Sequence, residues 1–401
     1  MGFLRRGSPR DRFAKQVLDA VLATGAVARA WYEPEAFAVR FQRSDDGDTG
    51  WIYLHNTFRE TEDASRSERQ ERVRRLVAAV VGEPRVDRGW DDVRPRLRPV
   101  LRGATFGQGM SNGDSVLLSR PAMPFLAELV VVDEPTSMAY VLEHHAREWG
   151  VDGDEIFAAA HANLAAGAAS ATHGEHRDGP AMIRFVDTGD AYFTSMLLID
   201  GFLADLAPRV GGRPVAFVPD KDTLAVLSGD HPDALAHFYE MMENEYRDAV
   251  RSLSPVGYTV DDRGRVVPYR TTEPGPLANR VHRAEVMLAA AEYNAQKEAL
   301  DSRHERDGVD IFVATVMAVE RPDGSTFSVS VWTDNCDTLL PETDHVFLQS
   351  SERDAFAVPW PIAAAEASFA PAPGFSPPRF RVRTWPEESV LHRLRAESIN
   401  L

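Results

Sequence analysis

Apolar residues near the start of the chain recur first at a helical spacing and then at a strand spacing. The positions that predict a helix face over 8–25 are Phe13, Val17, Val21 and Leu22. Ser8 and Pro9 favour the start of this helix, and Gly25 favours its end. Alternation of apolar and polar residues then predicts strands over 26–32, 36–44 and 50–56. A charged segment with an apolar stripe predicts a helix over 60–82.

A similar order of elements recurs further along the chain. Strands are predicted over 94–106 and 124–141, followed by a helix over 152–167. The second round comprises a strand over 181–188, a helix over 190–207, strands over 214–218 and 223–228, a helix over 230–253, a hairpin over 256–270 and a helix over 275–308. This α-β-β-α order resembles that of small α+β protein-binding folds such as the secretion-chaperone-like fold, a likeness of fold alone.

The pattern changes after Gly308. Two alternating runs predict a hairpin around 322–324, and later runs predict strands over 344–349, 355–360 and 379–385 and a helix over 386–398. We therefore predict an α+β fold of antiparallel sheets with packed helices. Its predicted parts are a first lobe over 1–167, a second similar lobe over 181–305 and a small β-rich C-terminal domain over 308–401.

Several segments resemble the bacterial YtpQ family of proteins of unknown function. They stand in the family's order and are residues 94–106, 127–141, 149–150, 154–164, 189–198 and 217–227. The resemblance covers roughly 8–270 and leaves out the C-terminal part. It departs from the family at 186–192, where an Asn is expected before Asp190. The resemblance implies a fold group and transfers no catalytic residue.

Composition limits the function classes. The chain has 401 residues, a formal net charge of −17 and one cysteine. A broad negative field repels nucleic acid and anionic membranes, so neither is expected as a partner. Cys336 alone can form neither an intramolecular disulfide nor a thiolate zinc site. Without a secretory signal, a membrane-spanning run or a cofactor motif, the sequence predicts a cytoplasmic protein with no cofactor.

Two carboxylates, Asp220 and Asp222, flank Lys221 between two predicted strands. They could form an acid/base pair, a metal ligand set or the tip of a hairpin. Two Asp residues on an exposed hairpin tip would share the same solvent-exposed environment. An acid/base pair instead needs two different environments, which shift the two pKa values apart. Pro219 and the Asp residues are also typical of turns. We therefore interpret the segment as a turn, with Asp222 the residue to watch.

A predicted strand-to-helix junction carries Asp190, Tyr192 and Ser195. Asp190 is favoured as a helix N-cap, since the segment lacks the glycines and the lysine of a phosphate loop. Tyr192 and Ser195 are kept as candidate binding residues. If Asp190 and Asp222 converge, they could hold a hard cation. His144 and His145 are neighbours on a predicted helix, and their side chains should point too far apart to chelate one ion.

Arginines alternate with apolar residues over 94–106. Arg94, Arg96, Arg98 and Arg102 are predicted to share one face of a strand. Such a face could bind an acidic peptide or a phosphate. The alternative is an edge strand that its charges and prolines protect from aggregation. Arg96, Arg98 and Arg102 are the candidate binding residues.

Two functions remain open. The first is a non-catalytic protein-binding or adaptor protein, supported by the missing catalytic motifs, the fold likeness and the arginine strand. The second is a metal-assisted hydrolase with Asp190 and Asp222 as ligands. A deep pocket that joins these two residues would favour the second. The partner, the substrate and the oligomeric state do not follow from the sequence.

Overall fold

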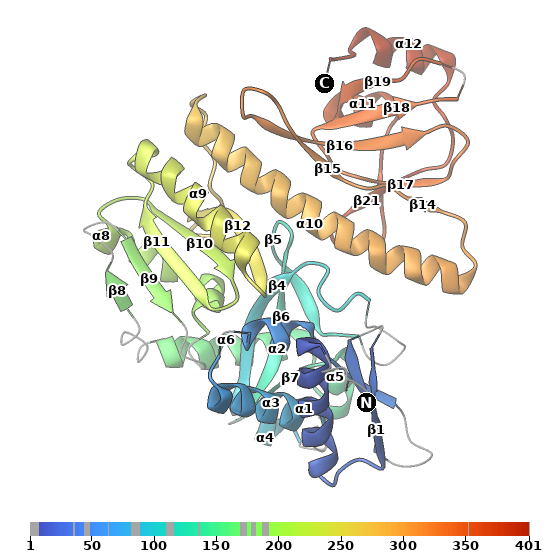
Figure 1. The fold of residues 1–401 in the computed structure, drawn as a ribbon. Coiled ribbons are helices and arrows are strands. Elements are labelled where there is room, and N and C mark those ends of the chain that lie inside the picture. The colour runs from blue at the N-terminus through green and yellow to red at the C-terminus, as the bar shows by residue number, and fades with distance from the viewer. Residues whose placement is uncertain are drawn as a thin grey trace, which may run out of the picture. The chain divides into compact units, whose positions relative to one another are not determined.

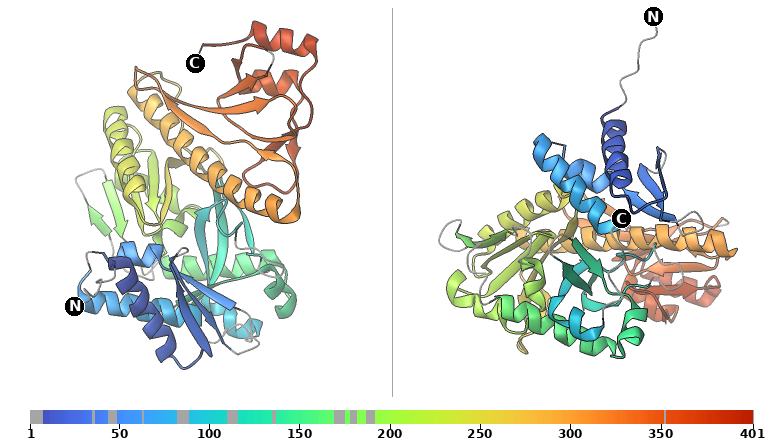
Figure 2. Two further views of the ribbon diagram at one scale, coloured as in Figure 1. Left: turned by 45° about the vertical axis from the view of Figure 1, so that its right-hand side comes forward. Right: turned by 90° about the horizontal axis from the view of Figure 1, so that it is seen from below.

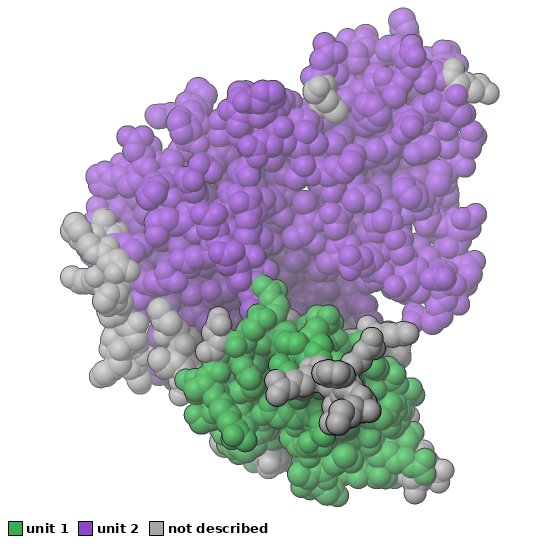
Figure 3. Space-filling view, viewed as in Figure 1, with its two compact units in different colours: residues 1–98, 130–141, 145–163 green, residues 99–129, 142–144, 164–401 purple. Residues whose placement is uncertain are grey.

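The computed structural model describes residues 8–34, 37–43, 49–62, 64–81, 89–109, 116–134, 137–168, 175–177, 182–186, 192–351 and 353–400. It forms two compact units, drawn green and purple in Figure 3. Unit 1 comprises residues 1–98, 130–141 and 145–163, and unit 2 comprises residues 99–129, 142–144 and 164–401. Both are α+β in architecture, with open sheets and packed helices, as the sequence predicts.

The N-terminal elements build unit 1 (Figure 1). They are α1 (Pro9–Ala23), β1 (Arg29–Glu33), β2 (Ala38–Gln42), β3 (Thr49–Tyr53), α2 (His55–Glu60), α3 (Arg66–Val81), α4 (Trp90–Val93) and the 3-10 helix η1 (Arg94–Arg96). Ser8 caps α1 as predicted: its Oγ accepts from the Asp11 amide at 3.1 Å, and Asp11 accepts from the Ser8 amide at 3.0 Å. Leu22, which the sequence places on the buried face, is 48% exposed instead.

The core of unit 1 is apolar. The strands β1, β2 and β3 form an antiparallel sheet, α1 lies against its inner face, and α3 packs beside α1. Phe41 and Ile52 on the sheet meet Phe13 and Val17 on α1 and Val77 on α3. The strict alternation of the strands therefore buries one face of the sheet and leaves the other outside this core.

The middle of the chain continues with β4 (Leu97–Gly103), β5 (Ser119–Met123), β6 (Leu126–Glu134), β7 (Ser137–Tyr140), α5 (Glu143–Trp149), α6 (Gly153–Ala168), β8 (Glu175–Arg177) and β9 (Met182–Val186). β6 pairs with β4, β5 and β7, and β4 ends the sheet order, the edge position that Pro99 suggests. β4 and β6 run from one unit into the other along the chain.

A six-stranded antiparallel sheet of order β13-β12-β10-β11-β9-β8 organises unit 2. Its further elements are η3 (Phe193–Leu198), α7 (Phe202–Asp205), α8 (Ala207–Val210), β10 (Pro214–Asp220), β11 (Thr223–Ser228), α9 (Pro232–Asp248), β12 (Ser252–Val260), β13 (Val266–Pro268) and α10 (Pro276–Asp307). α10 lies against α9 and β12, and on its other side it meets β15 and β16 (Figure 2). This helix therefore bridges the sheet and the C-terminal part within the same unit.

One predicted helix is wrong. The sequence predicts a single helix over 190–207, but the described part of this segment holds η3, α7 and α8 as three short pieces. Tyr192 and Gly201 have φ angles of 51° and 80°, in the left-handed region that interrupts a helix. Gly201 adopts that conformation without the strain of a side chain, so the chain turns there despite its apolar periodicity.

The C-terminal part of unit 2 is rich in β-structure, as predicted. Its elements are β14 (Phe312–Val313), β15 (Met317–Glu320), β16 (Thr326–Thr333), β17 (Thr338–Pro341), β18 (His345–Gln349), β19 (Phe356–Pro359), α11 (Trp360–Glu366), β20 (Pro371–Ala372), β21 (Arg379–Val382) and α12 (Glu388–Ala396). They form two sheets, of order β14-β17-β21-β20 and β15-β16-β18-β19. The pairs β14–β17 and β16–β18 are parallel, beside the antiparallel pairs that the sequence predicts.

The described helices include none that is both long and apolar enough to cross a membrane.

Candidate ligand-binding site

The two Asp residues singled out in the sequence lie at a hairpin tip. β10 and β11 pair antiparallel, and Lys221 and Asp222 form the turn between them. Asp220 Oδ1 accepts from the Asp222 and Thr223 amides at 2.7 and 2.8 Å, and the Lys221 ammonium contacts the Asp222 carboxylate. The turn interpretation is confirmed. Asp190 lies outside the described residues, so its roles as N-cap and as cation ligand with Asp222 stay predictions.

Tyr192 and Ser195, the other candidates of this region, are both buried. Tyr192 is 9% exposed and Ser195 only 1%. Ser195 belongs to η3 and donates its amide to the Tyr192 carbonyl at 2.9 Å. Their role in binding stays a prediction, and in this structure neither side chain offers an open surface.

The arginine segment does not form one continuous strand face. Arg94 and Arg96 lie in η1, and β4 begins only at Leu97, which corrects the expectation that four arginines alternate on one strand. The guanidinium of Arg96 donates to the Asp92 carbonyl and carboxylate at 3.0 and 2.9 Å. Arg98 donates to the Leu97 carbonyl at 2.8 Å, and Arg102 to the carbonyl of Leu101 at 2.7 Å. Their binding role stays a prediction, since these contacts engage them within their own segment.

A group of polar and charged side chains in unit 2 lines a cavity of about 800 Å³, which we call the α10 pocket. Its walls are the β5–β6 turn, one face of α10, the β17–β18 loop and the loop before β21. Apolar side chains dominate the lining, including Met123, Phe125, Val286, Leu288 and Phe375. Its polar lining residues are Arg270, His282, Glu285, Tyr293, Ser328, Glu342, Thr343 and Asp344. The pocket thus has a mainly apolar lining with one group of polar residues in its wall.

Asp344 is the centre of the polar group. Its Oδ2 accepts from the amide and the hydroxyl of Ser328 at 2.7 and 2.8 Å and lies 3.2 Å from His282 Nε2. Burial alone would raise the pKa of Asp344, but the hydrogen bonds from His282 and Ser328 outweigh it and lower the pKa. The hydrogen bond to Asp344 in turn raises the pKa of His282 against the opposing effect of burial. Both shifts favour the charged pair of imidazolium and carboxylate over the neutral pair.

Glu285 lies one helical turn from His282 and lacks a comparable partner. Among the described residues no hydrogen bond reaches its carboxylate; the nearest cationic atoms are Arg270 Nε at 3.7 Å and His282 Nδ1 at 3.9 Å. Its side chain is only 32% exposed. Burial raises the pKa of Glu285, which the positive charges of Arg270 and His282 partly offset. A half-buried carboxylate that accepts no hydrogen bond from the protein can accept one from a ligand.

This geometry differs from that of a nucleophilic triad. The hydroxyl of Ser328 donates to Asp344 rather than to His282, so no serine–histidine hydrogen bond activates a nucleophile. His282 also turns its two ring nitrogens towards two different carboxylates. One ion could not use both nitrogens, so these three residues do not form a chelating set. The arrangement binds and orients a group more readily than it attacks one.

The adjacent histidines on α5 are closer than the sequence suggests. Potential ligand atoms of His144, His145 and Glu148 lie within 4.8 Å of one another, so the expectation that these histidines diverge is wrong. The ring of His145 stacks on Trp149 at 5.3 Å. We assign no metal role to this group, because it is a local grouping on one short helix and such groups commonly occur without an ion.

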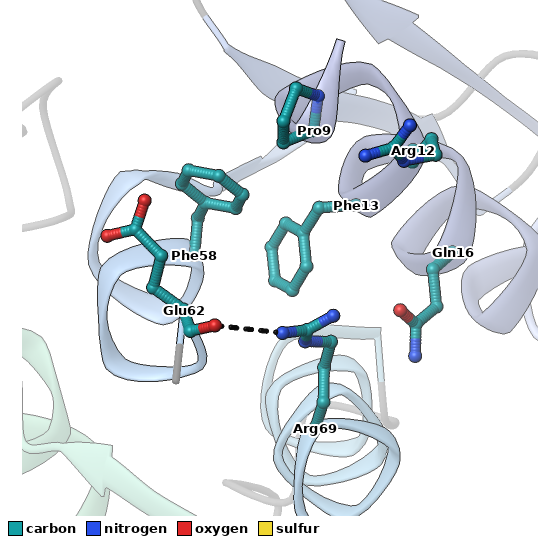
Figure 4. Close-up of a pocket in the computed structure, with 7 residues that line it drawn as sticks. All are labelled: Pro9, Arg12, Phe13, Gln16, Phe58, Glu62 and Arg69. Atoms are coloured by element: carbon teal, nitrogen blue, oxygen red, sulfur yellow. Dashed lines mark hydrogen bonds between the residues drawn. The ribbon is translucent and has the colours of Figure 1, made fainter. Parts of the chain in front are cut away.

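A second cavity, of about 480 Å³, lies in unit 1 (Figure 4). Phe13 from α1 and Phe58 from α2 form its apolar side, with ring centroids 5.4 Å apart. Arg69 reaches across from α3 and donates to the main-chain oxygen of Glu62 at 3.2 Å, the dashed contact in Figure 4. It also donates to the Thr61 carbonyl at 2.7 Å. Arg69 is thus engaged in holding α2 to α3.

Sequence reasoning missed the α10 pocket. His282 and Glu285 lie three residues apart on a long predicted helix, and this spacing predicts that they share one face of the helix. Asp344 lies 62 residues from His282 and lacks any local motif. No family model, no curated protein and no solved structure matches this chain. The resemblance to the YtpQ family therefore stays a prediction.

Proposed function

We propose that this chain is a non-catalytic binding protein that holds a small organic molecule in the α10 pocket. The ligand has an apolar body and an ammonium or other strong donor group. The observation that carries this proposal is the half-buried carboxylate of Glu285, which no described residue hydrogen-bonds and which opens onto a cavity of about 800 Å³. Pockets of this size and mixed lining are typical of small-molecule sites.

The lining supports the choice of ligand charge. Three carboxylates, those of Glu285, Glu342 and Asp344, face two cationic groups, those of Arg270 and His282. The Asp344 carboxylate is engaged by His282 and Ser328, and Glu342 is exposed, so Glu285 is the half-buried acceptor left for a ligand. A ligand ammonium at Glu285 would form a charge-assisted hydrogen bond, the stronger kind.

The test is a fluorescence titration with two matched probes. Dansylcadaverine carries an ammonium on an apolar dansyl body, and dansylglycine carries a carboxylate on the same body. We expect dansylcadaverine to bind with a blue-shifted emission and Glu285→Gln to weaken its binding by roughly tenfold or more, since a hydrogen bond to a charged group contributes about 1.5–3 kcal/mol.

Glu298→Gln provides the control, because Glu298 is an exposed glutamate of α10 that does not line the pocket. It should leave binding unchanged. Equal binding of both probes, or equal loss in both variants, would contradict the proposal. Failure of dansylcadaverine to bind the wild-type protein would also contradict it.

A further inference from the structure

The sheet of unit 1 displays an ordered set of side chains on the face turned away from its core. The register aligns Trp31, Arg40 and Trp51 in one cross-strand row, and Glu33, Ala38 and Tyr53 in the next. Trp51 is 38% exposed and Tyr53 is 61% exposed. Their rings are nearly parallel, at 11°, with centroids 6.1 Å apart. Large aromatic side chains exposed together on a sheet are unusual unless something covers them.

Arg40 is held in the middle of this face without a strong partner. Its guanidinium lies over the rings of Trp31 and Trp51, 5.1 and 5.2 Å from their centroids. Among the described residues no hydrogen bond reaches Arg40, and its Nε is buried without a partner. The nearest carboxylate oxygen, Glu33 Oε1, is 4.0 Å from Nη1 and accepts instead from the Trp31 indole at 2.7 Å. The two tryptophans thus orient an arginine whose ion pair with Glu33 is long, at 4.0 Å, and is not supported by a hydrogen bond.

Local charge favours an acidic occupant. Unit 1 is close to neutral, with 20 Lys and Arg residues against 22 Asp and Glu residues, although the whole chain has a net charge of −17. On the outer face itself, Arg29 and Arg40 outnumber Glu33. A carboxylate from a partner could form the bidentate pair with Arg40 that Glu33 does not form.

The shape of the face favours an extended chain. Alternate side chains of an extended segment lie about 6.6–6.8 Å apart, since the rise is about 3.3–3.4 Å per residue. That spacing is close to the 6.1 Å between the rings of Trp51 and Tyr53. Two apolar side chains of one extended segment can therefore rest on the two rings while a neighbouring carboxylate reaches Arg40.

We propose that the outer face of the β1–β2–β3 sheet is a docking surface for an acidic, extended peptide segment of a partner protein. The surface comprises Trp31, Arg40, Trp51 and Tyr53. It lies in unit 1 and does not depend on the ligand proposed for the α10 pocket.

The test is fluorescence anisotropy with a fluorescein-labelled peptide of three Leu-Thr-Leu-Thr-Glu-Thr units. The β-branched threonines favour an extended strand, which places Leu, Leu and Glu in succession on one side. We expect saturable binding that weakens as salt is added. Arg40→Gln should weaken it about tenfold or more, and Tyr53→Ala should weaken it similarly. Arg74→Gln, which removes an exposed arginine of α3, should leave binding unchanged.

The control ligands are the same peptide with Lys in place of Glu and a single-stranded oligothymidylate. Binding of the Lys peptide as tight as that of the Glu peptide would overturn the proposal, as would no binding of the Glu peptide. Tighter binding of the oligothymidylate would assign the face to nucleic acid instead. Because Tyr53 is 61% exposed, Tyr53→Ala keeps the fold even if Arg40→Gln does not, and wild-type affinity in that variant would also overturn the proposal.

Discussion

Units 1 and 2 place their polar chemistry in opposite positions. Unit 1 buries an apolar core around Phe41 and Ile52 and carries its arginine and aromatic residues on the outer face of a sheet. Unit 2 buries polar groups around α10, among them Gln296 and Glu243 at 1% and 5% exposure. A buried polar group must be hydrogen-bonded. The stability of unit 2 therefore depends on specific hydrogen-bond partners, whereas the stability of unit 1 depends on how well apolar side chains fill its core.

Arg379 is the clearest case in unit 2. It is fully buried, and burial lowers its pKa to about 10. No carboxylate pairs with it in the described structure; its guanidinium donates instead to Gln296 Oε1 and to the carbonyls of Tyr293, Ala314 and Leu339, at 2.6–3.1 Å. These contacts join β21 to α10 and to the strands beside it. Arg379 therefore links the C-terminal sheets to the helix through hydrogen bonds and through a cation–π contact, with its guanidinium 5.2 Å from the centroid of the Tyr293 ring.

The largest effect should follow from Arg379→Met. It removes four hydrogen bonds and leaves their buried acceptors unsatisfied, so the free energy of unfolding should fall by about 3–5 kcal/mol. Hydrogen–deuterium exchange should quicken in α10, β17 and β21 and stay unchanged in β2 and β3. Arg381→Met, which breaks a half-exposed pair with Asp337, should cost under about 1 kcal/mol. Equal costs for the two variants would contradict the special place of Arg379.

A smaller effect should follow from Ile52→Val in unit 1. Ile52 is 1% exposed, and loss of one methylene from such a core costs about 0.5–1.5 kcal/mol. Exchange should quicken in β2 and β3 and not in α10. A similar response of both units would show that they unfold together, and the comparison between them would then fail.

The smallest effect concerns the pH dependence of the His282–Asp344 contact. The pKa of His282 is raised above 6.5, so its contribution is full below that pH and is lost as the pH rises through the folded-state value. The pKa of Asp344 is lowered below 3.8, so its contribution is lost only as the pH falls through that lower value. The contact therefore contributes most between about pH 4 and 6.5.

We expect His282→Gln to lower the free energy of unfolding more at pH 5.5 than at pH 8.5, as measured by urea denaturation. The difference should be under about 1 kcal/mol, because His282 is 42% exposed and solvent screens the pair. The charges of Glu285 and His345 also interact with this pair, and both residues are present in the wild-type protein and in the variant. A larger loss at pH 8.5 would reverse the sign derived from these pKa shifts.

Local signals in the sequence predicted much of the fold. The Ser8 cap, the β10–β11 turn and the hairpin of β15 and β16 follow from neighbouring residues, which determine caps and tight turns. The helix predicted over 190–207 failed because apolar periodicity does not reveal a left-handed Gly201. The helix predicted over 230–253 ran past Asp248, where α9 ends and β12 soon begins.

The candidate sites were harder to predict. The α10 pocket depends on a turn at 121–126, a helix face, and loops at 342–344 and 375–378, and only tertiary packing joins them. The outer face of unit 1 is easier to predict from the sequence, because Trp31, Trp51 and Tyr53 alternate with other residues within predicted strands. The position of Arg40 between two tryptophans nevertheless depends on the register of the three strands, which cannot be read from a single sequence.

α10 acts as a rigid rod with several attachments. Its 32 residues extend over about 48 Å at 1.5 Å per residue. Arg283 ties it to α9 and β15, residues 282–293 form a wall of the pocket, and Gln296 holds Arg379. The same helix therefore contacts both the pocket, at Glu285, and the C-terminal sheets, through Gln296 and Arg379. A ligand that displaced α10 would displace its attachment to those sheets as well.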